Sequence, residues 1–102
     1  MSGNPVPSVS VTEASERDPS SVLVDVREAD EWADGHVADA VHVPMSSIAI
    51  EQIPEGRPVY CICRSGNRSG KVAEALINAG VEAINVEGGM IAWAAAGLPV
   101  ER

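Results

Sequence analysis

The residues best suited to chemistry lie together in one short segment, residues 63–69, which reads Cys-Arg-Ser-Gly-Asn-Arg-Ser. An apolar run typical of a buried strand precedes it, and apolar residues at helical spacing follow it. A turn between a strand and a helix lets successive backbone N–H groups converge on one point, and the helix N-terminus adds partial positive charge. Such surroundings, together with neighbouring arginines, lower the pKa of a thiol. The segment therefore predicts that Cys63 is ionised at neutral pH and acts as a nucleophile.

The other residues of the segment are candidates for holding a substrate. Arg64 and Arg68 do not lose their charge, and we expect them to bind an anion and the negative charge that moves during attack. The hydroxyls of Ser65 and Ser69 are expected to donate hydrogen bonds to the sulfur or to the substrate. The predicted substrate-binding residues are Arg64, Ser65, Gly66, Asn67, Arg68 and Ser69.

The size of the segment indicates what Cys63 attacks. Four residues separate Cys63 from Arg68, whereas the cradle of a cysteine phosphatase encloses one residue more. The tighter loop suits a transferable sulfur atom better than a phosphoryl group, and no acid is evident that would protonate the leaving oxygen of a phosphate ester. A phosphatase or an arsenate reductase is therefore the less favoured type of enzyme.

Residues outside the segment are given structural roles. Cys61 lies inside the predicted strand and is expected to be a core residue. Asp25 and Arg27 follow another buried run, where an acid and an arginine are expected to form a structural ion pair that fixes the neighbouring loops. No metal and no cofactor is predicted. The remaining predictions are a turn or surface position for His36 and His42, either of which could still approach Cys63, core positions for Trp32 and Trp93, and a tight turn at Gly88-Gly89.

Composition limits the functions open to this chain. Of its residues, 45% are hydrophobic, which is enough for the core of one domain. A chain of 102 residues is too short for a two-domain enzyme. A net charge of −8 repels phosphate backbones, so no nucleic-acid partner is expected. No apolar run reaches the roughly 18 residues that span a bilayer and the start shows no signal segment, so we expect a cytoplasmic protein without a membrane partner. The two cysteines are too close for an ordinary disulfide and too few for structural zinc.

Strand and helix patterns alternate along the chain. Residues 1–7 are expected to form a flexible lead-in to a single domain over residues 8–102. Short strands are predicted around residue 9 and at 41–43, and buried strands at 22–26, 59–62 and 83–86. Helices are predicted from residue 12, at 28–34, weakly at 47–53, after residue 69 up to Gly80, and at 90–96. This alternation predicts an α/β fold with a central, mostly parallel sheet, helices on both faces, and ligands beyond the carboxyl ends of the strands.

With these motifs the sequence resembles the rhodanese family in its single-domain form. Besides residues 63–69, the resemblance rests on Asp25-Val26-Arg27-Glu28, Glu31 with Gly35-His36-Val37, residues 40–44, and Gly88-Gly89 with Trp93, Gly97, Leu98 and Pro99. It implies the three-layer rhodanese fold and sulfurtransferase chemistry with Cys63 as the sulfur carrier. In that family a loop of the length found here from Cys63 to Arg68 goes with sulfur substrates, and a loop one residue longer goes with related phosphatases.

The resemblance also implies a reaction in two steps. The Cys63 thiolate takes the outer sulfur of a small anionic donor such as thiosulfate, which releases sulfite and leaves a persulfide held by the backbone N–H groups of residues 64–69. A thiol, or cyanide in an assay, then removes that sulfur. One alternative stays open: a sulfur-relay or protein-interaction module whose donor or acceptor is another protein and which acts little on thiosulfate. An acidic surface could steer basic partners to such a module.

Overall fold

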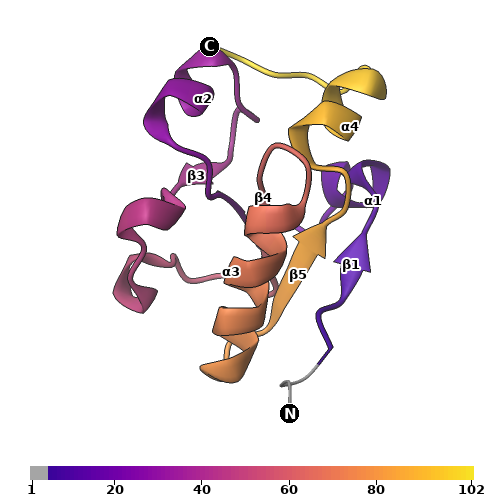
Figure 1. Ribbon diagram of the computed structural model, residues 1–102. Coiled ribbons are helices and arrows are strands. Elements are labelled where there is room, and N and C mark those ends of the chain that lie inside the picture. The colour runs from indigo at the N-terminus through magenta and orange to yellow at the C-terminus, as the bar shows by residue number, and fades with distance from the viewer. Residues whose placement is uncertain (1–4) are drawn as a thin grey trace.

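The computed structural model describes residues 5–102, and its centre is a five-stranded sheet in the order β1-β5-β4-β2-β3 (Figure 1). All neighbouring strands in this sheet are parallel. The strands are β1 (Ser8–Val9), β2 (Val22–Asp25), β3 (Val41–His42), β4 (Val59–Ile62) and β5 (Ala83–Val86). The predicted parallel α/β architecture is therefore confirmed, with β4 and β5 at the bounds that the apolar runs indicated.

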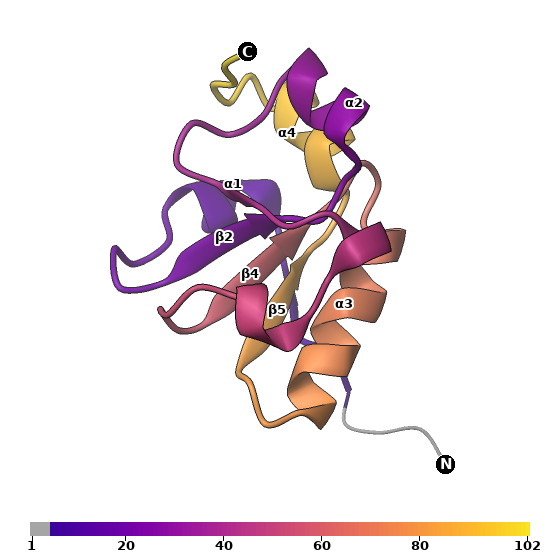
Figure 2. The same cartoon turned by 90° about the vertical axis from the view of Figure 1, so that its left-hand side faces the viewer.

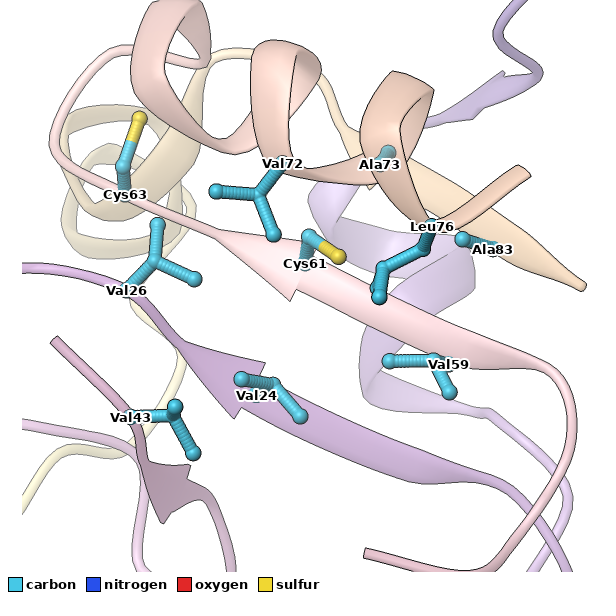
Figure 3. Close-up of a cluster of buried hydrophobic side chains, with 10 residues drawn as sticks. All are labelled: Val24, Val26, Val43, Val59, Cys61, Cys63, Val72, Ala73, Leu76 and Ala83. Atoms are coloured by element: carbon cyan, nitrogen blue, oxygen red, sulfur yellow. The ribbon is translucent and has the colours of Figure 1, made fainter. Parts of the chain in front are cut away.

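Helices cover both faces of the sheet, which gives the three layers that were predicted (Figure 2). α3 (Asn67–Asn78) covers one face, and α1 (Val11–Ser15) and α4 (Gly89–Ala95) cover the other. Side chains alternate along each strand, so β2 sends Val24 to the α3 side and Leu23 to the opposite side. The buried residues on the α3 side, here called the α3-side cluster, are Val24, Val26, Val43, Val59, Cys61, Cys63, Val72, Ala73, Leu76 and Ala83 (Figure 3).

The remaining elements lie between β2 and β4 along the chain. α2 (Ala29–Asp34) follows β2 where a helix was predicted. The weakly helical stretch after β3 forms two short 3₁₀ turns, η1 (Met45–Ser47) and η2 (Ile50–Gln52). α3 begins at Asn67, earlier than its apolar spacing indicated, because its first turn is polar and carries no periodic signal. The end of the candidate segment therefore belongs to a helix.

The predicted lead-in falls partly outside the described residues, since residues 1–4 are not among them. Of the remainder, Val6 packs against the α3-side cluster, and the Pro7 carbonyl accepts a hydrogen bond of 2.8 Å from the backbone N–H of Asn85. Trp93 is 2% exposed and occupies the predicted core position. Across residues 5–102, none of the helices has both the length and the apolar character needed to cross a membrane.

Gly88 and Gly89 form the predicted tight turn before α4, with φ values of +81° and +56°. A Cβ on Gly89 would lie 2.4 Å from the carbonyl oxygen of Cys63 and 2.6 Å from the carbonyl carbon of Arg64. These backbone atoms cannot move without displacing the candidate segment. The turn therefore requires glycine at position 89 for space as well as for conformation.

We predict that Gly89→Ala lowers the free energy of unfolding by about 3 kcal/mol, because left-handed strain adds to a backbone clash. Gly97→Ala is the matched control, since Gly97 also has a positive φ of +73° but open space around the added Cβ. It should cost only about 1 kcal/mol. Urea unfolding of both variants measures the difference, and equal losses would contradict the proposed close approach.

Candidate active site

The segment that contains Cys63 forms a loop beyond the carboxyl end of β4. Cys63 follows the last residue of β4, and α3 begins four residues later at Asn67. Between them, Gly66 has a φ of +103°, a left-handed conformation that glycine adopts without steric cost. This turn directs the backbone N–H of Gly66 back to the sulfur of Cys63, with an N–S distance of 3.1 Å. The loop thus has the inward-facing N–H geometry that the sequence predicted for an anion site.

The sulfur of Cys63 lies at the floor of this loop. Cys63 is only 1% exposed and belongs to the α3-side cluster, yet its sulfur points toward the start of α3 (Figure 3). The hydroxyl of Ser69 lies 3.3 Å from the sulfur, within the distance at which it can donate a second hydrogen bond to it. Cys63 is thus a hydrogen-bonded thiol at the edge of the core.

Two opposing influences set the pKa of Cys63. Burial is the largest single one and raises the pKa, because a charged sulfur loses contact with water. Hydrogen bonds oppose it, from the Ser69 hydroxyl first and then from the backbone N–H groups of Ser69, Gly66 and Ser65. Together they outweigh burial, so the pKa of Cys63 lies below the ordinary value of a thiol. The loop therefore favours the thiolate through oriented N–H and O–H dipoles.

Asn85 of β5 supports the loop from behind. Its amide nitrogen donates to the Gly66 carbonyl at 3.1 Å, and its amide oxygen lies 2.6 Å from the Ser69 hydroxyl. A hydroxyl carries one proton, so Ser69 donates either to Asn85 or to the sulfur. An ionised sulfur is the stronger acceptor, which favours the second orientation once Cys63 has lost its proton. Asn85 could not be predicted as part of the site, because a single polar residue in a buried strand carries no sequence signal of its own.

The N-terminal turn of α4 fixes the start of the loop. The backbone N–H of Met90 donates to the Cys63 carbonyl at 2.8 Å, and that of Ile91 donates to the Arg64 carbonyl at 3.0 Å. These bonds satisfy carbonyls at the edge of the sheet, where no further strand is available to do so. They hold the backbone on one side of the sulfur while Asn85 holds it on the other.

The two arginines of the loop have different surroundings. Arg68 donates from both terminal nitrogens to the two carboxylate oxygens of Glu31 in α2, at 2.7 and 2.8 Å. Arg64 is exposed and makes no ion pair with any other described residue. Arg68 therefore closes the loop as predicted, but its guanidinium already has an anionic partner.

Asp25 and Arg27 form a buried ion pair at the end of β2. The two residues are 0% and 6% exposed, and the closest nitrogen and oxygen lie 2.8 Å apart. The guanidinium also donates to the Gly35 carbonyl at 2.7 Å, which ties β2 to the end of α2. This pair is attached to the end of α2, the helix that carries Glu31, and lies outside the hydrogen-bonded surroundings of the sulfur.

Comparison with known proteins shows to which family this arrangement belongs. The Rhodanese-like domain family matches residues 10–96. The chain is a member of the rhodanese family. A rhodanese-related protein from Thermoplasma volcanium has the same fold, with a TM-score of 0.84, 32% identity and coverage of 93% of this chain and 97% of that one. The predicted rhodanese fold is therefore confirmed.

Two curated relatives extend the similarity. A protein from Allochromatium vinosum named sulfurtransferase is 43% identical over 82 residues, which cover 78% of this chain and 77% of the relative. An uncharacterized protein from Synechocystis sp. is 46% identical over 81 residues, which cover 76% of this chain. The matched part of this rhodanese domain spans only 45% of the Synechocystis protein, so that relative extends well beyond the shared region.

The second cysteine of this rhodanese domain has surroundings unlike those of Cys63. Cys61 is 0% exposed and lies among the apolar side chains between β4 and α3 (Figure 3). Burial, followed by the nearby charge of Cys63, raises the pKa of Cys61 to about 12. The predicted core role of Cys61 is confirmed, and the thiol stays protonated at neutral pH.

One expectation about the aromatic residues is wrong. Trp32 is half-buried, and its ring stacks between His36 and His42, with centroid distances of 3.7 and 4.6 Å. A position on the short surface helix α2 explains this, because that helix buries no residue. Both imidazoles bond to backbone carbonyls, those of Trp32 and Arg27. Within the described part of the chain, no three His, Cys, Asp or Glu side chains gather closely enough to hold a metal ion.

We predict that Ser69→Ala raises the pKa of Cys63, because burial then acts against fewer hydrogen bonds. The rate of alkylation by iodoacetamide as a function of pH measures this pKa. Ser65→Ala is the matched control: Ser65 contributes through its backbone N–H, so removal of its hydroxyl should leave the pKa unchanged. Equal effects of the two substitutions would contradict the role given to the Ser69 hydroxyl.

We also predict that Glu31 makes the free energy of unfolding depend on pH in the acidic range. The hydrogen bonds from Arg68 lower the pKa of Glu31 from 4.5 to about 2, against the opposing effect of burial. Because the pKa of Glu31 is lower in the folded than in the unfolded state, its ionised carboxylate stabilises the fold at pH values above 4.5. This contribution disappears as the pH falls from 4.5 through about 2. Glu31→Gln should therefore cost about 1 kcal/mol at neutral pH, discounted for partial exposure, and almost nothing near pH 2. Urea unfolding across this range measures the change, with Asp30→Asn on the same helix as control.

Proposed function

We propose that this rhodanese domain, over residues 8–102, is a sulfurtransferase that carries a sulfane sulfur as a persulfide on Cys63. The observation that supports this most directly is the sulfur at the focus of the loop, where Gly66 and Ser69 donate to it and lower its pKa. A buried thiol with these donors is prepared for nucleophilic attack. The relative named sulfurtransferase supports the same class of reaction.

The first step is a displacement at sulfur with thiosulfate as the donor. The Cys63 thiolate attacks the outer sulfur and forms a new S–S bond. The bond between that outer sulfur and the sulfite sulfur breaks, and its electron pair leaves with sulfite. The negative charge then lies on the terminal sulfur of the persulfide. The backbone N–H groups of residues 64–69 are suited to hold this charge, and Arg64 is suited to attract the anionic donor.

The second step returns the enzyme to its starting state. A thiolate acceptor, or cyanide in an assay, attacks the terminal sulfur of the persulfide. The S–S bond to Cys63 breaks, and its electron pair restores the thiolate while the acceptor leaves as a persulfide or as thiocyanate. The two displacements balance without a redox cofactor and predict ping-pong kinetics. A reaction that cycles through a free thiolate suits a reducing compartment, which supports a cytoplasmic location.

The loop length supports sulfur transfer over phosphate hydrolysis. Gly66 donates directly to the sulfur at 3.1 Å, so the loop closes tightly around a single atom. A tetrahedral phosphate needs donors arranged around three further oxygens, which the shorter loop has less room to provide. We therefore assign to Ser65, Asn67 and Ser69 the role of binding the persulfide sulfur and the sulfur donor.

We predict that incubation with thiosulfate adds one sulfur atom, about 32 Da, to the protein, and that cyanide removes it. Intact-mass spectrometry measures both changes. Cys63→Ser should abolish the addition, whereas Cys61→Ser should retain it because Cys61 lies in the core. An unmodified wild-type protein after treatment with thiosulfate and with a small persulfide would show that the proposed function is wrong.

A further inference from the structure

The ion pair between Glu31 and Arg68 places an acid beside the candidate active site. The contact is bidentate, and the two side chains are 25% and 34% exposed, so water screens it only in part. One carboxylate oxygen also accepts a hydrogen bond of 3.1 Å from the backbone N–H of Glu28. The charge of Arg68 is thus largely compensated at the point where it closes the loop around Cys63.

The position of Glu31 is fixed by polar contacts around α2. No residue of α2 is buried, so hydrophobic packing does not hold this helix. Instead, Glu28 accepts hydrogen bonds from the hydroxyl and the backbone N–H of Ser46, and the buried Arg27 donates to the Gly35 carbonyl. The stack of Trp32 between two histidines adds a third attachment. Glu31 is therefore held against Arg68 from both ends of its helix.

This arrangement changes the charge that a donor meets. Arg64, next to Cys63 in the chain, is exposed and carries a positive charge that no described carboxylate pairs with, whereas Arg68 and Glu31 together carry no net charge. Coulomb energy is proportional to the charge of the ligand, so compensating Arg68 weakens the attraction for a dianion twice as much as for a monoanion. Thiosulfate is a dianion. A persulfide of a neutral thiol brings a single negative charge to the same sulfur atom.

We propose that Glu31 determines donor specificity, because its pairing with Arg68 biases the site toward donors with one negative charge and against the thiosulfate dianion. This inference rests on the proposed function and narrows the class of its donor. With a persulfide donor, the Cys63 thiolate attacks the terminal sulfur, the donor S–S bond breaks, and the electron pair leaves with the donor thiolate.

Glu31→Gln tests the proposal with little change of shape. The amide oxygen of glutamine can still accept from Arg68 and from the Glu28 N–H, while the negative charge is removed. The KM for thiosulfate should fall by about tenfold at low salt, with kcat little changed, because one compensating charge is lost at the rim. The KM for the persulfide of 2-mercaptoethanol should fall only about threefold, the square root of that factor, because this donor is a monoanion. Added salt should reduce both effects.

Two further variants separate charge from structure. Glu31→Asp keeps the charge but shortens the side chain, so its KM for thiosulfate should stay near the wild-type value. Asp30→Asn removes an exposed acid from the same helix without touching Arg68, and both KM values should stay unchanged. The inference is overturned if Glu31→Asp shifts the KM values as Glu31→Gln does. It is also overturned if Glu31→Gln changes the KM for both donors by the same factor, or lowers kcat for both, because Glu31 then has only a structural role.

The outcome for the wild-type protein separates this inference from the proposed function. If neither donor forms a persulfide on Cys63, the proposed function fails and the specificity proposal fails with it. If both donors react and Glu31→Gln shifts their KM values by the same factor, only the specificity proposal fails.

Discussion

A negative charge on a nearly buried sulfur is costly, and the hydrogen bonds that offset this cost determine much of the structure around Cys63. Burial is the largest influence on the pKa of this thiol and opposes ionisation, so the donors must already be in place before the charge forms. The backbone N–H of Gly66 can serve only if its peptide is fixed. Bonds from the Asn85 amide, and from Met90 and Ile91 in α4, fix the peptides on both sides of the sulfur.

The two cysteines show how local this effect is. They lie two positions apart along the same chain segment and belong to the same cluster under α3, yet burial raises the pKa of Cys61 to about 12 while that of Cys63 is lowered. The two pKa values differ because Cys61 lies within β4, whereas Cys63 lies just beyond its end. Within β4 the backbone N–H groups are used by neighbouring strands, whereas beyond Ile62 they are free to turn toward a side chain. A parallel sheet places such a position at its carboxyl edge, where the start of a helix adds further donors.

The sequence allowed the sheet to be predicted and the loop around Cys63 to be located, because both have local signals. Continuous apolar runs marked β4 and β5 at their observed bounds, and residues 63–69 carry their chemistry in consecutive positions. Glu31 and Asn85 escaped the analysis of the site because they are 37 and 16 positions away from the loop residues that they contact. Glu31 stood among the motifs of the family resemblance, which was the one available signal, whereas Asn85 had none. The start of α3 and the position of Trp32 were misjudged because hydrophobic spacing does not describe a polar first turn or a helix without buried residues.

The distribution of charge is compatible with the proposed anion site in an acidic chain. Three arginines, Arg17, Arg27 and Arg68, are each paired with a carboxylate. These carboxylates largely neutralise the positive charge that the three arginines would present to an anion. Backbone dipoles cannot be neutralised in this way, because the fold fixes their number and direction. The attraction of a dipole for a charge falls off more steeply with distance than that of a guanidinium, so the N–H groups act mainly on the atom that they contact. A site that relies on N–H donors and one unpaired arginine therefore selects for the sulfur atom itself, and the carboxylate of Glu31 is the group that tips this balance.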